Sequence, residues 1–374
     1  TRVPRGAVSM SIDRLGGGDR AVVVVLSGFP RRSETFVLPE LTAMERAGLL
    51  MTAFATKPGD GLVPHPDAAS LSPRVRVLRG GSAADQAREI VAQLGTRRPR
   101  AIHGYFAHHP TAVAACVAGH LRVPYGFSVH ARDARAVPQS ELSRRATRAR
   151  CVVVCNTDAH AEMARLGVTP ALIPHGVNLT RFAPSPLPAD GELRVLAVGR
   201  LVPKKGFNVL LEAIARVRVP WTLRIVGDGP DGPALRSLAD LLGIRPRITW
   251  HGSASHVDLP ALYAGAHLVA VPSVVDEAGD RDGLPNVVLE ALASERPVVA
   301  SRVGAIASAI VDGETGLLVA AGNTGDLASA IETVAQRADL ARAIARRGRQ
   351  AVERRYDVAV CAGRFVETLD AAYD

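Results

Sequence analysis

The sequence predicts an α/β protein built from two similar domains, each a parallel β-sheet with helices on both faces. Its 374 residues are too many for one ordinary core and suit two such domains. Short apolar runs alternate with helical patterns across Gly- or Pro-rich turns, which is typical of parallel sheets wound on both sides. The proline-rich stretch Phe182–Gly191 indicates a linker between two halves that begin alike.

The first half contains one series of predicted strands and helices. Its buried apolar runs of strand length are Ala21–Leu26, Ala101–His103, Tyr125–Val129, Cys151–Cys155 and Ala171–Ile173. Helical periodicity between these runs covers Val37–Arg46 and Pro110–His120.

A second series follows the linker. Its strand-like runs are Leu193–Val198, Leu223–Val226, Ile248–Trp250, Leu268–Val271 and Pro297–Ala300. Helical patterns cover Val209–Val217 and Pro285–Ala293, and a last one covers Val358–Tyr373. We therefore place the first domain at residues 1–183 and the second at 184–357. Ligands of open α/β sheets lie beyond the carboxyl ends of the strands, so the predicted active site is the cleft between the two sheets.

Composition excludes several classes of binding protein. Aromatic residues make up only 4% of the chain, too few for a carbohydrate-binding module or a single-stranded nucleic-acid groove built on stacking. The sequence also contains no recognisable nucleic-acid reading motif. We therefore expect no nucleic-acid partner.

The net charge of +9 is distributed unevenly. Residues 1–185 hold 24 basic and 13 acidic side chains, hence +11, and residues 186–374 hold 21 and 23, hence −2. The basic half could meet an anionic membrane surface or an acidic acceptor, or it could be an ordinary solvated surface. The sequence does not predict an oligomeric state.

Cysteine usage and hydropathy predict a cytoplasmic protein, with peripheral association at the inner membrane face left open. Cys151 and Cys155 flank a valine run, and no second Cys/His pair has a matching metal-ligand spacing. Buried thiols fit a reducing compartment. No apolar run approaches the ~18 residues that span a bilayer, and residues 1–20 lack the apolar core of a signal peptide.

The segment Gly279–Leu292 carries the clearest chemical signal. Pro285 suits the first turn of a helix, and the amides that open this helix would form a diphosphate site. Asp282 lies just before the helix and Glu290 between one and two turns along it. Both carboxylates could accept hydrogen bonds from sugar and ribose hydroxyls. The alternative is an ordinary helix cap with a surface glutamate.

The loop Gly199–Gly206 supplies positive charge at the carboxyl end of a predicted strand. Arg200 and Lys205 could hold a diphosphate and stabilise the charge that grows on it as a sugar leaves. The alternative is a solvated basic turn.

These segments resemble glycosyltransferase family 4, in particular exopolysaccharide-type members, which are retaining enzymes of the GT-B fold. In the second half the resemblance lies in Gly199–Gly206, Ile225–Pro230, Ile248–Gly252, Asp282–Asn286 with Glu290, Pro297–Ser301, Gly304 and Asp312–Leu317. In the first half it is looser and lies in Ser33–Phe36, Phe127–His130, Ile173–Val177 and Phe182.

The resemblance implies two facing Rossmann-like domains, with the helix over residues 358–374 crossing back to the first. It implies that Arg200 and Lys205 hold the donor diphosphate, Glu290 accepts from the ribose hydroxyls and Asp282 meets the transferred sugar. The donor-binding residues so expected are Arg200, Lys205, Gly227, Gly252, Asp282, Gly283, Leu284, Pro285, Asn286 and Glu290. The catalytic residues so expected are His130, Arg200, Lys205 and Asp282, with His130 near the reaction centre on the first domain.

The implied reaction moves a hexose-type sugar from a nucleotide diphosphate donor to a glycan, lipid carrier or small-molecule acceptor. The cations and helix amides would neutralise the leaving group, so we expect no metal, no cofactor and no protein nucleophile. Rival interpretations are a nucleotide-sugar epimerase or a glycan phosphorylase of the same architecture, or a non-catalytic nucleotide-sugar-binding protein.

Two departures from the family pattern affect these expectations. Asp282 stands where the family usually has Glu, so its side chain is one methylene shorter and reaches less far toward the transferred sugar. The paired glycines of the first loop are replaced around Arg31–Glu34, where the acceptor would be bound.

Gly227–Gly232 literally matches the dinucleotide-binding pattern G-x-G-x-x-G. Prolines interrupt this pattern, and no acidic residue follows at the required distance, so we interpret the segment as a strand-end loop near the donor.

Overall fold

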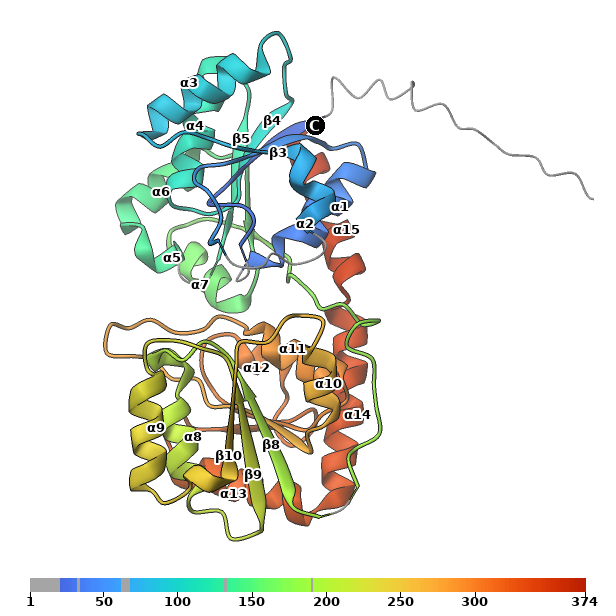
Figure 1. Ribbon diagram of the computed structural model, residues 1–374. Coiled ribbons are helices and arrows are strands. Elements are labelled where there is room, and N and C mark those ends of the chain that lie inside the picture. The colour runs from blue at the N-terminus through green and yellow to red at the C-terminus, as the bar shows by residue number, and fades with distance from the viewer. Residues whose placement is uncertain (1–20, 32–33, 62–67, 131–132, 190) are drawn as a thin grey trace, which may run out of the picture.

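The protein consists of two domains, which lie in the upper and lower halves of Figure 1. Each domain contains one sheet of parallel strands that is covered by helices. The computed structural model describes residues 21–31, 34–61, 68–130, 133–189 and 191–374. The first sheet has seven strands in the order β3-β2-β1-β4-β5-β6-β7, and the second has six in the order β10-β9-β8-β11-β12-β13. Every strand pairing is parallel. The predicted α/β fold class with two Rossmann-like domains is confirmed.

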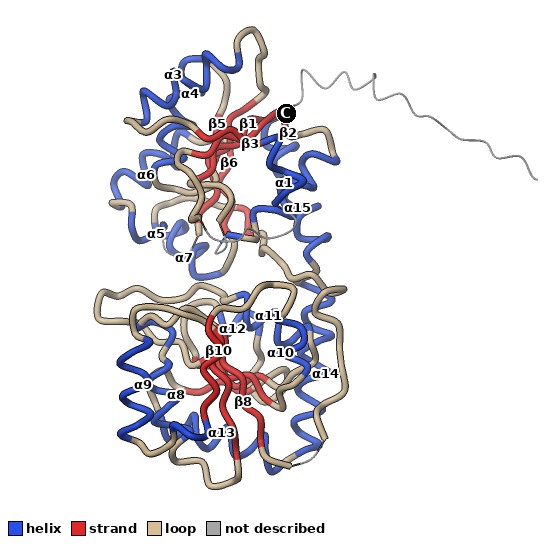
Figure 2. Tube along the Cα trace, viewed as in Figure 1, coloured by secondary structure: helices blue, strands red, loops and turns tan. Residues whose placement is uncertain are grey.

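The first sheet forms from the N-terminal half of the chain. Its strands are β1 (Val22–Leu26), β2 (Leu50–Ala55), β3 (Val75–Val77), β4 (Ala101–Gly104), β5 (Tyr125–Val129), β6 (Cys151–Val154) and β7 (Ala171–Leu172). Its helices are α1 (Val37–Arg46), α2 (Ala68–Leu71), α3 (Ala83–Leu94), α4 (His109–Leu121), α5 (Asp133–Ala136), α6 (Gln139–Arg148) and α7 (Thr157–Arg165). Figure 2 shows the helices on both sides of the strands, as the alternating pattern predicts.

The second sheet follows the linker. Its strands are β8 (Leu193–Val198), β9 (Trp221–Val226), β10 (Ile248–Gly252), β11 (Leu268–Val271), β12 (Val298–Ser301) and β13 (Leu317–Val319). Its helices are α8 (Phe207–Ile214), α9 (Gly232–Leu241), α10 (Leu259–Ala264), α11 (Asn286–Ala293), α12 (Ile306–Ala309), α13 (Thr324–Gln336) and α14 (Ala338–Arg355).

Most differences from the predicted elements are small. Helix α11 begins at Asn286 rather than Pro285, because Pro285 keeps an extended backbone with ψ of 134° and serves as the N-cap. Cys155 lies just past the end of β6 rather than in the strand. The strands β2, β3 and β13 were not among the predicted runs. For β3 the reason is that its VRV sequence lies at the sheet edge and is mostly exposed, so apolar periodicity gives no signal there.

The C-terminal helix α15 (Val358–Tyr373) leaves the second domain and packs against α1 of the first. Figure 1 shows it in red at the right of the first sheet. The chain also passes between the domains in the segment that contains Val177, and this segment runs beside the start of α15. The Val177 amide donates to the Tyr356 carbonyl at 2.7 Å, and the Val358 amide donates to the Val177 carbonyl at 3.1 Å. The boundary at residues 183 and 184 stays a prediction.

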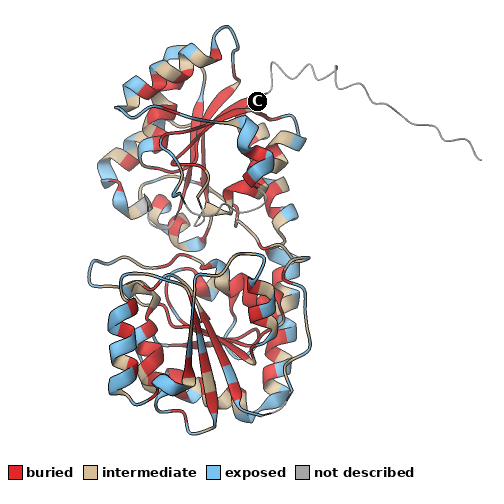
Figure 3. Cartoon of the chain, in the orientation of Figure 1, coloured by how far each residue is buried: buried red, intermediate tan, exposed pale blue. Residues whose placement is uncertain are grey.

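The sheets are the interior of both domains, and Figure 3 shows their strands as predominantly buried. All five valine and leucine side chains of β1 are buried, as expected for a central parallel strand covered on both faces. Within the described ranges, no helix combines the length and the apolar character needed to cross a bilayer.

Candidate active site

The site predicted on the second domain lies where β8 and β11 end. The loop after β8 carries Lys205, and Ser273 lies two residues beyond β11. The Lys205 ammonium contacts a carboxylate oxygen of Asp282 at 2.8 Å, and the Ser273 hydroxyl donates to the same oxygen at 2.8 Å. Asp282 is buried, with 8% of its surface exposed. The basic loop and the segment that opens helix α11 therefore meet.

Lys204 contacts the same segment. Its ammonium lies 3.0 Å from the Asp280 carboxylate and 3.9 Å from that of Asp282. Lys204 and Lys205 thus face Asp280 and Asp282 just before the N-terminus of α11. Sequence analysis did not select Lys204 or Ser273, although both follow a strand at its carboxyl end, which is the signal that selected Lys205.

Gly283 to Asn286 lead from this cluster into α11. The Gly283 carbonyl accepts from the Ala305 amide at 3.0 Å, which fixes the segment against the loop after β12. A side chain at Gly304 would collide there, because its Cβ would lie 2.1 Å from the Asp282 carbonyl oxygen. Pro285 is buried, Leu284 is half-buried and Asn286 is exposed.

Glu290 occupies a different part of the site. It is 5% exposed and accepts a hydrogen bond of 2.8 Å from the Tyr263 hydroxyl. Burial raises the pKa of Glu290 to about 7, although the Tyr263 bond and the Arg181 charge act in the opposite direction. Tyr263 was missed by sequence analysis because it lies 27 residues away on α10 and has no motif of its own.

Glu290 lines a small cavity between the two domains. The cavity has a volume of about 80 Å³, and the side chains that line it include Phe36 and His175 from the first domain and Arg181, His256 and Asn286. A larger cavity of about 820 Å³ lies between the linker and the helices α13 and α14, and none of the predicted site residues lines it. We assign the site by its charged groups rather than by cavity size.

The loops after β8, β9 and β10 come close together beside this cluster. The Gly227 amide donates to the Gly252 carbonyl at 2.8 Å. Gly227 has a φ of 141°, and a Cβ there would lie 1.9 Å from the Gly199 carbonyl oxygen, so only glycine fits. Arg200 follows Gly199 and its side chain is exposed.

His130 lies in the first domain at the end of β5, within a group of rings. Its imidazole stacks on His175 and Tyr105, with centroids 5.2 Å and 5.5 Å away, and tilts against Phe36 and Phe106. Only 9% of its surface is exposed. The structure therefore places His130 in the packed wall of the first domain, and no described contact joins it to Lys205 or Asp282.

His175 is held by a buried carboxylate. Its Nδ1 lies 3.1 Å from Glu40, and its ring stacks on Phe36 with centroids 4.0 Å apart. Burial disfavours a charge on His175, but Cys155 and Glu40 outweigh burial and raise its pKa to about 10. Among the described residues no group of three or more His, Cys, Asp or Glu has the geometry to hold a metal ion.

Two family models match the chain. One described as Glycosyltransferase Family 4 matches residues 33–181, and one described as Glycosyl transferases group 1 matches residues 192–337. The D-inositol 3-phosphate glycosyltransferases of Mycobacterium tuberculosis and Mycobacterium bovis are 38% identical over 200 residues. These matches cover 48% of this chain and 40% of the length of those relatives.

Solved structures share the fold over nearly the whole chain. HepE of Anabaena in complex with UDP is 19% identical, with a TM-score of 0.79 over 94% of this chain and 100% of that one. The sucrose-phosphate synthase of Thermosynechococcus elongatus is 24% identical, with a TM-score of 0.75 over 94% and 100%. At such identities the likeness establishes the arrangement of the two domains.

Proposed function

The chain belongs to glycosyltransferase family 4 and has the GT-B fold, and from this premise we propose that it transfers a hexose-type sugar from a nucleotide diphosphate sugar to an acceptor with retention of anomeric configuration. The observation that carries the proposal is the 2.8 Å contact between Lys205 and Asp282 just before the N-terminus of α11. It brings a cation, a carboxylate and a helix N-terminus to one place, which are the groups that a sugar diphosphate requires.

In this proposal the second domain holds the donor. Arg200 and Lys205 bind the diphosphate, with the backbone around Gly283 and Asn286 opposite them. Asp282 meets the sugar, and Glu290 accepts from the ribose hydroxyls. The glycine loops at Gly227 and Gly252 border the nucleotide, because they allow close approach of backbone to ligand.

The first domain presents the acceptor in this mechanism. The cations stabilise the charge that develops on the leaving diphosphate, and its phosphate oxygen takes the proton of the attacking hydroxyl on the same face of the sugar. Retention then requires neither a protein nucleophile nor a metal. His130 lies on the acceptor side, where its packing against Phe36 and His175 fixes the orientation of its ring. Closure of the domains excludes water and limits hydrolysis.

UDP-sugars are the first donors to test, since HepE was solved with UDP and with UDP-glucose. The basic first half is the surface that we propose to meet an anionic membrane or an acidic acceptor.

Donor binding and transfer can be tested separately. Thermal unfolding with UDP, GDP, ADP and dTDP, each with and without its sugar, identifies the base, because a ligand that binds only the folded state stabilises it. NMR of the product with the selected donor then gives the anomeric configuration, and we expect retention. Lys205→Ala should weaken diphosphate binding by about tenfold or more.

The rival activities give different products. An epimerase would release an isomer of the donor, and a phosphorylase would cleave a glycan only when phosphate is present. A binding protein would give a thermal shift with neither transfer nor slow hydrolysis. Normal transfer by Glu290→Ala would contradict the site assignment.

A further inference from the structure

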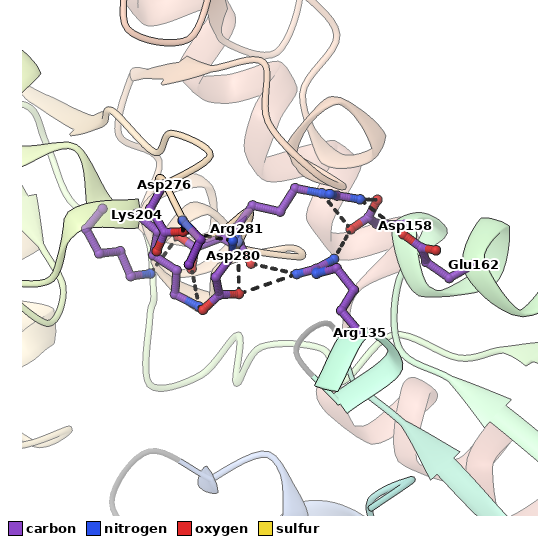
Figure 4. A network of polar contacts seen from close by, with 10 residues as sticks. Arg135, Asp158, Glu162, Lys204, Asp276, Asp280 and Arg281 are labelled. Atoms are coloured by element: carbon purple, nitrogen blue, oxygen red, sulfur yellow. Dashed lines mark hydrogen bonds and ion pairs between the residues drawn. The ribbon is translucent and has the colours of Figure 1, made fainter. Parts of the chain in front are cut away.

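A network of charged side chains joins the first domain to the donor-side segment of the second (Figure 4). Arg281 donates from Nη2 to Asp158 at 2.8 Å and from Nε to the other oxygen of the same carboxylate at 3.2 Å. Its Nη2 also lies 3.3 Å from Glu162. Asp158 and Glu162 are one turn apart on α7, so this helix presents both carboxylates to one guanidinium.

Arg135 on α5 reinforces the contact from the first domain. Its Nη1 donates to Asp158 at 2.9 Å, and its Nη2 donates to the backbone carbonyl of Arg281 at 3.0 Å. Asp158 therefore binds one arginine from each domain. The first domain also holds the backbone of the second, because Arg135 donates to the Arg281 carbonyl. Figure 4 shows both guanidinium groups directed at this one carboxylate.

The network continues into the residues assigned to the donor. Arg281 lies between Asp280 and Asp282 in the chain. The Asp280 carboxylate contacts Lys204 at 3.0 Å and lies 3.6 Å from Arg135, while Asp282 contacts Lys205. Any displacement of Arg281 would therefore act on the segment that carries Asp282.

These ion pairs differ from ordinary surface pairs. The side chains of Arg135, Asp158, Glu162 and Arg281 are only 15–24% exposed. The Arg281–Asp158 contact is bidentate, a geometry that adds both energy and orientation. The hydrogen bond that Arg281 donates to Asp158 is the largest of the effects that raise the pKa of Arg281. Partial burial reduces the screening by salt that weakens exposed pairs.

We propose that Asp158, assisted by Glu162, is a positioning residue that acts across the domain interface through Arg281, holding the donor segment in place only when the two domains are together. The proposal rests on the proposed function in assigning the donor to this segment. Acceptor-side and donor-side surfaces are thereby coupled: closure orders Asp282, and a donor bound at Asp282 favours closure in return.

The test uses Asp158→Asn in the full chain, which removes the charge and keeps the size of the side chain. Glu45→Gln is the matched control, because it removes the Glu45–Arg74 pair within the first domain, away from the interface. We expect Asp158→Asn to increase the radius of gyration of the free protein in small-angle X-ray scattering. We also expect about tenfold weaker UDP-glucose binding by calorimetry. The control should match the wild type in both measurements.

A double-mutant cycle with Arg281→Gln separates positioning from a general loss of stability. If Asp158 acts through Arg281, the two effects on UDP-glucose affinity are non-additive, and the second substitution adds little to the first. Additive effects, or scattering and affinity unchanged in Asp158→Asn, would overturn the proposal. If the wild type binds no nucleotide sugar, the proposed function fails and the assignment of a donor segment with it. The scattering of Asp158→Asn then decides whether the interface contact itself holds the domains together.

Discussion

At the scale of single residues, the burial of Glu290 carries a cost to stability. Its carboxylate is buried beside Tyr263 and keeps a pKa near 7, far above the ordinary value of 4.5. The folded protein therefore holds a proton that the unfolded chain releases between these two values. Stability contributed by this proton is present at low pH, is lost as pH rises from 4.5 to about 7, and stays lost above that window.

Glu290→Gln should therefore stabilise the free protein at pH 8, because the amide cannot ionise in the buried site. The shift corresponds to about 3 kcal/mol at most in the free energy of unfolding, and the gain should vanish at pH 4. Urea unfolding at both pH values measures it. Glu367→Gln, on the exposed part of α15, is the control and should show no gain at either pH. A Glu290→Gln variant no more stable at pH 8 than the wild type would show that Glu290 is not held in a raised-pKa environment.

At the scale of elements, the strand ends decide where loops can meet. The loops after β8, β9 and β10 approach one another because parallel strands bring their carboxyl ends to one edge of the sheet. The approach is so close that the Gly227 position has no room for a Cβ next to the Gly199 carbonyl. Such backbone contact holds these loops together without using side chains.

Gly227→Ala should displace this loop and weaken both folding and donor binding. The methyl group meets backbone, and the positive φ adds about 1–2 kcal/mol for any L-residue. We expect a total loss of roughly 3 kcal/mol or more by urea unfolding. Gly243→Ala has a positive φ of 69° but no atom within 4 Å of the added Cβ, so it isolates the backbone term. Equal losses in the two variants would mean that the contact with Gly199 is unimportant.

At the scale of the whole molecule, the C-terminal helix ties the chain's end into the first domain. The Tyr373 hydroxyl lies 2.9 Å from Nδ1 of His103, whose Nε2 lies 2.9 Å from the Ser128 hydroxyl. Burial first, and then the charge of His130, lowers the pKa of His103 to about 3, so this ring is neutral at physiological pH. Arg100 binds the same end of the helix through the Tyr373 carbonyl and Asp370.

Tyr373→Ala should selectively destabilise the first domain. It leaves a cavity beneath α15 and removes the partner of His103, and we expect a loss of about 3–5 kcal/mol. Differential scanning calorimetry should show an earlier unfolding transition for the first domain while the second keeps its midpoint. Val360→Ala, on the same helix but 58% exposed, should shift neither transition. A uniform shift of both transitions would mean that the domains unfold as one unit.

The sequence by itself determined the architecture and predicted that the basic loop and the segment before the Pro285 helix meet on the second domain. Apolar runs that have the length of buried strands predict both sheets. Because parallel strands bring their carboxyl ends to one edge of a sheet, Lys205 and Asp282 are expected at the same edge, and they are in contact there. Only the tertiary structure decided which distant side chains pair: Tyr263 with Glu290 in the site, Asp158 with Arg281 at the domain interface, and Tyr373 with His103 under the C-terminal helix. Periodicity and turn chemistry are local, whereas these pairs depend on how α7, α10 and α15 pack after the sheets have formed. No local pattern of the sequence encodes such contacts.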